Sequence, residues 1–269
     1  MKTIQAFASA LLLIAAGCSV TERPNSPDRH PAVTRVVTMT AQPRPFQIDL
    51  QKTAVIVVDM QNDCVSKGGL FDRVGIDITG IQKIVTPIRR TLEVARQSGL
   101  PIVYLRMGYR PDLSDIGSED SPMGAENRRT HVGERMGTPD GREGRFLVRD
   151  TWNTEIVDEL KPQANDIVLY KTRYSGFYNT DLDAVLKRLG VRTLIMTGCT
   201  TSVCVESTIR DATFRDYTPV VLSDCTAEPL GKELARTNHE ASLYLVQAAP
   251  FGLVATSEDF AKALVTLKP

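Results

Sequence analysis

Short apolar runs alternate with segments of helical periodicity along most of the chain. Ala54–Val58 is a continuous apolar run, which is typical of a strand buried on both faces of a sheet. Elsewhere, apolar residues such as Ile81, Ile84 and Ile88 recur at helical spacing. The pattern predicts strands at 54–58, 102–105, 167–170, 194–197, 219–222 and 253–255, and helices at 81–95, 154–160, 182–189, 203–214 and 232–246.

Strands that alternate with helices favour a mostly parallel sheet with helices on both faces. We therefore predict an α/β fold, a single-domain three-layer sandwich around a six-stranded sheet, over residues 46–269. Residues 107–149 are polar and Gly-rich and too long for an ordinary connection. Two interpretations stay open for them, a lid on the substrate side and a surface insertion.

The first eighteen residues have the pattern of a secretory signal. A positive start is followed by an apolar stretch over residues 4–16 and small residues before Cys18. The ending Ile14–Cys18 resembles a bacterial lipoprotein box, although Ala15 stands where Leu is commoner, and predicts lipidation of Cys18. Residues 19–45 then read as a Pro-rich tether. We expect an exported protein that is periplasmic or attached to the membrane by a lipid on Cys18. The alternative to lipidation is simple cleavage near the same place, which gives a soluble exported protein. If the segment is not a signal, we expect a cytoplasmic protein.

The composition excludes several classes of binding site and catalytic site. Among 269 residues, Lys and Arg total 32 and balance 32 Asp and Glu, which argues against a nucleic-acid binder. Five cysteines without a C-x-x-C pair indicate neither a zinc knuckle nor a disulfide framework. With only His30, His131 and His239, a metal site built from histidines or a Ser-His-Asp triad is not expected. No cofactor is predicted.

Three reactive residues follow predicted strands. Asp59 comes after the first, Lys171 after the third, and Cys204 just past the fourth. Ligands of open parallel sheets bind at the carboxyl ends of the strands, so these side chains should meet. A helix N-terminus and a Lys ammonium both lower a thiol pKa, and a carboxylate can take the thiol proton and return it to a leaving amine. Each residue alone has an ordinary structural explanation. Together they predict acyl transfer by a cysteine nucleophile.

The segments around these residues resemble the isochorismatase-like cysteine hydrolases. They are Val57–Asp63 (VVDMQND), Lys171 with Tyr174–Phe177 (YSGF), and Thr197–Val205 (TGCTTSVCV). The resemblance implies a catalytic triad of Asp59, Lys171 and Cys204. It also implies a cis peptide between Cys199 and Thr200, an oxyanion hole from the N–H groups of Thr200 and Cys204, and a homo-oligomer.

Within that family, the likeness is greatest to the ureidoacrylate amidohydrolases. It implies cleavage of a C–N bond in a small ureido or amide substrate, with Tyr109, Asp115, Tyr174 and Phe177 as substrate-binding residues. Met107–Tyr109 (MGY) departs from the Asn-Gly-Trp of those enzymes. That departure bears on the identity of the substrate and leaves the reaction type unchanged.

Several alternatives remain. The Asp-x-His metal motif of related nicotinamidases is absent from residues 106–112, so no metal is predicted. Cys204 to Arg210 fits the phosphatase pattern C-x5-R, but the intervening residues lack Gly and include an acid. Isochorismate-type hydrolysis and a non-catalytic surface protein on the same fold stay open. The thiols Cys64, Cys199 and Cys225 are expected to be packed, with pairing to Cys204 as the alternative.

Overall fold

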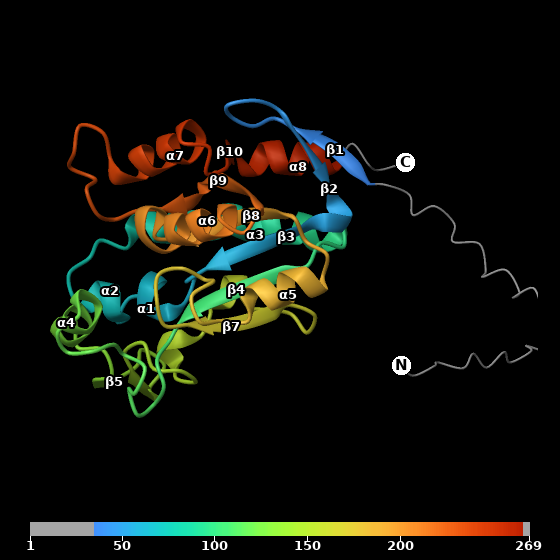
Figure 1. Cartoon of the computed structure of the whole chain (residues 1–269). Helices are drawn as coiled ribbons and strands as arrows, with labels where there is room; N and C mark the ends of the chain where they lie inside the picture. The colour runs from blue at the N-terminus through green and yellow to red at the C-terminus, as the bar shows by residue number, and fades with distance from the viewer. Residues whose placement is uncertain (1–34, 266–269) are drawn as a thin grey trace, which may run out of the picture. The chain divides into compact units, whose positions relative to one another are not determined.

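Six parallel strands form the central sheet, in the order β10-β9-β8-β3-β4-β7. In the computed structural model, which describes residues 35–265, all six predicted strands are present. The strands are β3 (Thr53–Val58), β4 (Ile102–Met107), β7 (Ile167–Lys171), β8 (Thr193–Cys199), β9 (Thr218–Ala227) and β10 (Leu253–Ala255). Because all strands run the same way, their carboxyl ends meet at one edge (Figure 1).

Helices cover both faces of the sheet, as predicted. Along β3, Val55 and Val57 face one hydrophobic cluster, and Ala54, Ile56 and Val58 face the other. The first cluster includes residues of α3 (Thr79–Gln97) and α8 (Ser257–Val265). The second includes residues of α5 (Leu182–Arg188), α6 (Glu206–Thr213) and α7 (Asn238–Ala248). The arrangement is a three-layer sandwich, with α5 and α6 drawn in front of the sheet in Figure 1.

Two predicted helices differ from the structure. Instead of a helix at 154–160, two short 3-10 turns occur at Trp152–Thr154 and Asp158–Leu160. Between them Val157 donates its N–H to the Met60 oxygen at 3.1 Å, so tertiary pairing holds this stretch extended. The helix expected from 232 begins at Asn238 instead. Thr237 forms a capping box with Glu240 and thereby fixes the start.

The domain begins earlier than the sequence indicates. Strands β1 (Val36–Met39) and β2 (Phe46–Asp49) pair in antiparallel fashion, and buried Val37 and Met39 join the cluster that contains α8. The tether predicted over 19–45 is therefore wrong for residues 35–45, because burying alternate side chains of β1 makes this segment part of the fold. Cys18 and the rest of the predicted signal lie outside the described residues.

The long segment between β4 and β7 has its own structure. It contains α4 (Pro122–Arg129) and a small hairpin of β5 (Arg135–Gly137) and β6 (Glu143–Arg145). Met107, Tyr109, Phe146 and Leu147 form a separate hydrophobic cluster there. The helices α1 (Asn62–Val65) and α2 (Leu70–Arg73) lie beside it (Figure 1).

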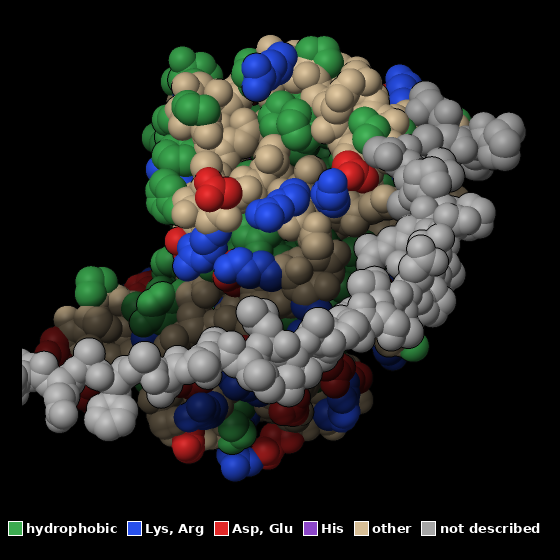
Figure 2. Space-filling view, turned by 45° about the vertical axis from the view of Figure 1, so that its right-hand side comes forward, with side chains coloured by type: hydrophobic (Ala, Val, Ile, Leu, Met, Phe, Trp, Pro, Cys, Tyr) green, Lys and Arg blue, Asp and Glu red, His purple; other side chains and the backbone are tan. Residues whose placement is uncertain are grey.

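The described surface carries mixed charge. On the face drawn in Figure 2, Lys and Arg side chains stand among Asp, Glu and hydrophobic side chains. This agrees with the balance of 32 basic and 32 acidic residues. Of the helices within residues 35–265, none combines the length and apolar character needed to cross a membrane.

Asp63 is a buried carboxyl that ties α1 to the long segment. It accepts hydrogen bonds from Leu70 N (2.9 Å), Leu147 N (2.6 Å) and Asn153 Nδ2 (2.6 Å). Burial raises the pKa of Asp63 from 3.8 to about 7, against the opposing effect of these donors. Protonation is therefore easier in the folded than in the unfolded protein, so the contribution of Asp63 to stability falls as pH rises between these values.

We expect the stability difference between wild type and Asp63→Ala to be larger at pH 5 than at pH 8. The interval between pH 5 and the folded pKa of about 7 spans roughly two pH units. It corresponds to a change of about 3 kcal/mol in the difference between the two free energies of unfolding. Urea denaturation of both proteins at the two pH values measures the change. The same difference at both pH values would contradict the assignment.

Candidate active site

The structure brings Asp59, Lys171 and Cys204 together at the carboxyl edge of the sheet. Lys171 Nζ lies 2.7 Å from Asp59 Oδ2 and 3.3 Å from Cys204 Sγ. Asp59 Oδ1 accepts a hydrogen bond from Met107 N at 2.8 Å. The three residues are 3%, 1% and 9% exposed, respectively. Three segments distant in sequence thus supply a carboxylate, an ammonium and a thiol in one buried chain of contacts.

The backbone before Cys204 is unusual at three points. Gly198 has φ +108°, and a Cβ there would lie 2.0 Å from the Val58 oxygen, so only glycine fits. The next peptide bond, between Cys199 and Thr200, is cis. Thr200 O then accepts from Val203 N and Val205 N in a π-helical turn over Thr201–Val205 that leads into α6. Cys204 therefore sits on the turn that joins β8 to α6.

The electrostatics of Cys204 differ from the prediction made from sequence. Burial raises the pKa of the thiol above its usual range, and nearby Asp59 adds to this, whereas Lys171 opposes it. For Lys171, burial disfavours the charge, but Asp59 and Cys204 together raise its pKa. The expected lowering of the thiol pKa by Lys171 is present, but desolvation of the buried sulfur outweighs it. The Cys204 sulfur thus lies beside the ion pair of Asp59 and Lys171.

A cavity of about 190 Å³ opens onto these groups. Asp59, Cys199, Thr200 and Cys204 form its floor, and Tyr174 is part of its wall. The remaining wall is mostly apolar and comes mainly from α2, the residues that follow it, and the loop before α7. Its members include Leu70, Phe71, Val74, Ile76, Val203, Pro229 and Leu230. Within residues 35–265, no group of three or more His, Cys, Asp and Glu side chains is placed to hold a metal ion.

Three predicted substrate-binding residues do not line this cavity. Tyr109 is fully buried, and its hydroxyl accepts from Asn127 Nδ2 at 2.8 Å. Asp115 pairs with Arg149 at 3.1 Å. Phe177 is buried in the sheet core against Tyr217, with ring centroids 5.7 Å apart. In this structure the three side chains are used for packing and ion pairing instead. Tyr109 supports the wall through its hydrogen bond with Asn127, which does line the cavity.

Comparison with known proteins agrees with this geometry. The sequence profile of the isochorismatase domain matches residues 53–259. A ureidoacrylate amidohydrolase RutB from Caulobacter segnis is 40% identical over 233 residues, which are 87% of this chain and 94% of that protein. The chain belongs to the isochorismatase family. RutB from Yersinia enterocolitica is 38% identical over 226 residues, which cover 84% of this chain and 95% of that protein.

Solved structures support the same assignment to the isochorismatase family. A cysteine hydrolase from Pseudomonas syringae pv. phaseolicola has a TM-score of 0.68 and 31% identity, over 81% of this chain and 95% of that chain. N-carbamoylsarcosine amidase from Thermoplasma acidophilum has a TM-score of 0.55 and 29% identity, over 77% and 97% of the two chains. The family resemblance inferred from the motifs is thus confirmed.

Sequence reasoning missed two features of this isochorismatase-family site. Glu126 and Asn127 of α4 line the cavity, but α4 lies in the segment whose path no periodicity predicted. Glu228 accepts from Ser202 N (2.9 Å) and Oγ (2.5 Å), and also from Leu230 N at 3.0 Å. It therefore ties the turn that carries Cys204 to a loop that forms part of the wall.

The other thiols and the histidines within the described residues make packing, hydrogen-bond or ion-pair contacts. Cys64 and Cys199 both line the cavity, and Cys199 Sγ donates to the backbone oxygen of Asp59 at 3.3 Å. Cys225 lies 3.6 Å from Thr91 Oγ1 in the core. All of the cysteines within residues 35–265 are free thiols. His239 Nδ1 lies 2.9 Å from Thr201 Oγ1, and exposed His131 pairs with Glu134.

Proposed function

We propose that this chain is a cysteine-dependent amidohydrolase that cleaves a C–N bond of a small ureido or amide compound through a thioester intermediate. The observation that carries the proposal is the contact of Cys204 with Lys171, itself paired with Asp59, at the floor of a buried cavity. Relatives named ureidoacrylate amidohydrolase support a ureido substrate. A neighbour named N-carbamoylsarcosine amidase supports the same bond type.

In the first half of the reaction, Asp59 takes the proton of Cys204 and the thiolate attacks the substrate carbonyl carbon. The raised thiol pKa favours this order, because a protonated Cys204 needs a base at the moment of attack. Lys171 stabilises the thiolate and holds Asp59 in place at 2.7 Å. The N–H groups of Thr200 and Cys204 are proposed to stabilise the tetrahedral oxyanion.

In the second half, Asp59 returns the proton to the departing nitrogen, and the C–N bond breaks. A water molecule then attacks the thioester and gives up a proton to Asp59. Collapse releases the acid and regenerates the thiol of Cys204. If the acyl group is carbamoyl, the product carbamate decays to ammonia and carbon dioxide. The chain's own residues thus supply a base, a nucleophile and a stabilising cation.

We also propose export and attachment through Cys18, and a homo-oligomeric assembly. The apolar stretch of residues 4–16 and the small residues before Cys18 support export. A single lipid would attach the protein to a membrane surface. Metabolic labelling with a fatty-acid analogue, compared between the full chain and Cys18→Ala, tests the attachment. Light scattering of the purified protein tests the assembly.

A panel of ureido acids, primary amides and isochorismate tests the proposed reaction. We expect ammonia from at least one ureido acid or amide and no turnover of isochorismate. Turnover of isochorismate alone would support the rival hydrolase. No ammonia from any compound, together with no covalent labelling of Cys204 by an amide-mimicking thiol reagent, would favour a non-catalytic surface protein.

A further inference from the structure

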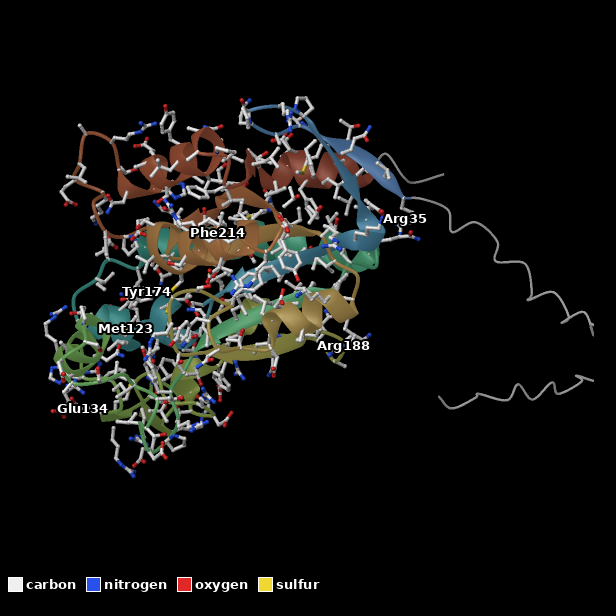
Figure 3. All side chains as sticks on the ribbon, viewed as in Figure 1. Arg35, Met123, Glu134, Tyr174, Arg188 and Phe214 are labelled. Carbon is white, nitrogen blue, oxygen red and sulfur yellow. The ribbon has the colours of Figure 1, made fainter. Side chains whose placement is uncertain are left out.

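A second hollow, of about 590 Å³, adjoins the catalytic cavity. We call it the outer recess. It is lined by Ser118, Ser121, Pro122, Met123, Glu126, Arg173 and Tyr174. Glu126 and Tyr174 line both spaces, so the outer recess continues the path that leads to Cys204. Figure 3 labels Tyr174 and Met123 at the carboxyl end of the strands, with Arg188 at the opposite end of the sheet.

Arg173 gives the outer recess a positive charge that no carboxylate balances. Its Nη1 donates to the backbone oxygens of Thr172 (2.6 Å) and Asp115 (3.2 Å). Within residues 35–265, no Asp or Glu oxygen lies within 4.0 Å of this guanidinium. The carboxylate of Asp115 is taken by Arg149 instead. The guanidinium is thus half-buried and oriented, with hydrogen-bonding capacity left for a ligand.

Besides Arg173, the only charged residue that lines the outer recess within residues 35–265 is Glu126, and it is paired. Glu126 accepts hydrogen bonds from Arg129 Nε (2.8 Å) and Nη2 (2.6 Å). Lys171 is balanced by Asp59, deeper in the site. Among the residues that line the outer recess, Arg173 therefore supplies the one charge without a salt-bridge partner. Lys171 Nζ also donates to the backbone oxygen of Arg173 at 3.4 Å. This contact holds the backbone that carries the guanidinium close to the Lys171 ammonium.

We propose that Arg173 binds a carboxylate at the far end of the substrate, so that the enzyme selects anionic ureido or amide acids over neutral ones. This inference rests on the proposed amidohydrolase function. A guanidinium presents paired donors that match a carboxylate, whereas Lys offers only a point charge. The ureido or amide carbonyl would lie at Cys204, and the carboxylate would lie in the outer recess beyond Tyr174. Arg173 is thereby a specificity-determining residue.

The test compares ureidoacrylate with its methyl ester, which keeps the ureido group and removes the charge. We expect Arg173→Gln to lower kcat/KM for the acid by about 10- to 100-fold, mainly through KM, because a charge-assisted hydrogen bond is lost. The ester should change by less than about threefold. For the acid, the kcat/KM of Arg173→Lys should lie between those of wild type and Arg173→Gln. Arg188→Gln removes the same charge from the exposed far end of α5 and should leave both substrates unchanged.

A binding measurement separates this inference from catalysis. In a Cys204→Ala background, calorimetry should show ureidoacrylate binding that weakens by a similar factor when Arg173→Gln is added. Equal losses for acid and ester, or a wild type that does not prefer the acid, would overturn the role of Arg173 and leave the amidohydrolase function standing. Absence of ammonia from either compound and from every amide tested would instead contradict the proposed function itself.

Discussion

Replacing Cys204 by alanine is expected to reduce ammonia release at least about 10⁴-fold, because the proposed thioester cannot form without the sulfur. The pair of Asp59 and Lys171, 2.7 Å apart, does not depend on the sulfur, so the fold should persist in this variant. Ammonia release under saturating substrate, with circular dichroism to confirm folding, measures the effect. The predicted loss lies in kcat, since the sulfur acts on the reacting carbon.

Cys225→Ala is the matched control. It removes the same atoms from a buried thiol that lies in the core beside Thr91, away from the catalytic cavity. Its activity should stay within about twofold of wild type, with a modest loss of stability from the small cavity created. If Cys204→Ala retained more than a few per cent of the wild-type rate, the thioester route would be wrong.

The second large effect is expected at the buried ion pair. Lys171→Met leaves the carboxylate of Asp59 without its partner in a site where both side chains are almost fully buried. Removing one partner of a buried pair typically costs about 3–5 kcal/mol in the free energy of unfolding. Activity should also be lost, because the thiolate loses its stabilising cation. Urea denaturation and ammonia release measure the two effects.

A double variant separates stability from chemistry. Adding Asp59→Asn to Lys171→Met removes the unpaired charge, so most of the lost stability should return while activity stays absent. Lys187→Met is the control, since it breaks an ion pair with Asp183 of the same 2.7 Å length on the exposed surface of α5. That change should cost less than about 1 kcal/mol. A double variant as unstable as Lys171→Met would show that the pair is not the cause.

The sequence by itself determined the sheet and which reactive residues gather at its carboxyl edge. Each strand is a short apolar run, and burial on both faces of a parallel sheet requires that pattern. Once the strands are known, the parallel direction places Asp59, Lys171 and the turn before Cys204 at the same edge. Local hydrophobic pattern and chain direction were therefore enough to bring together residues that are far apart in sequence.

Only the tertiary structure decided the walls of the cavity and the direction in which burial shifts the thiol pKa. Tyr109, Asp115 and Phe177 proved to be packed or ion-paired, and Glu126, Asn127 and Leu230 took places on the wall. Likewise, the segment before β2 joined the fold through the buried side chains of β1. Loop packing, burial and desolvation arise from contacts between distant segments, which no local periodicity encodes. The residues proposed for catalysis thus follow the strands, whereas most of the wall that would contact a substrate comes from the connections between them.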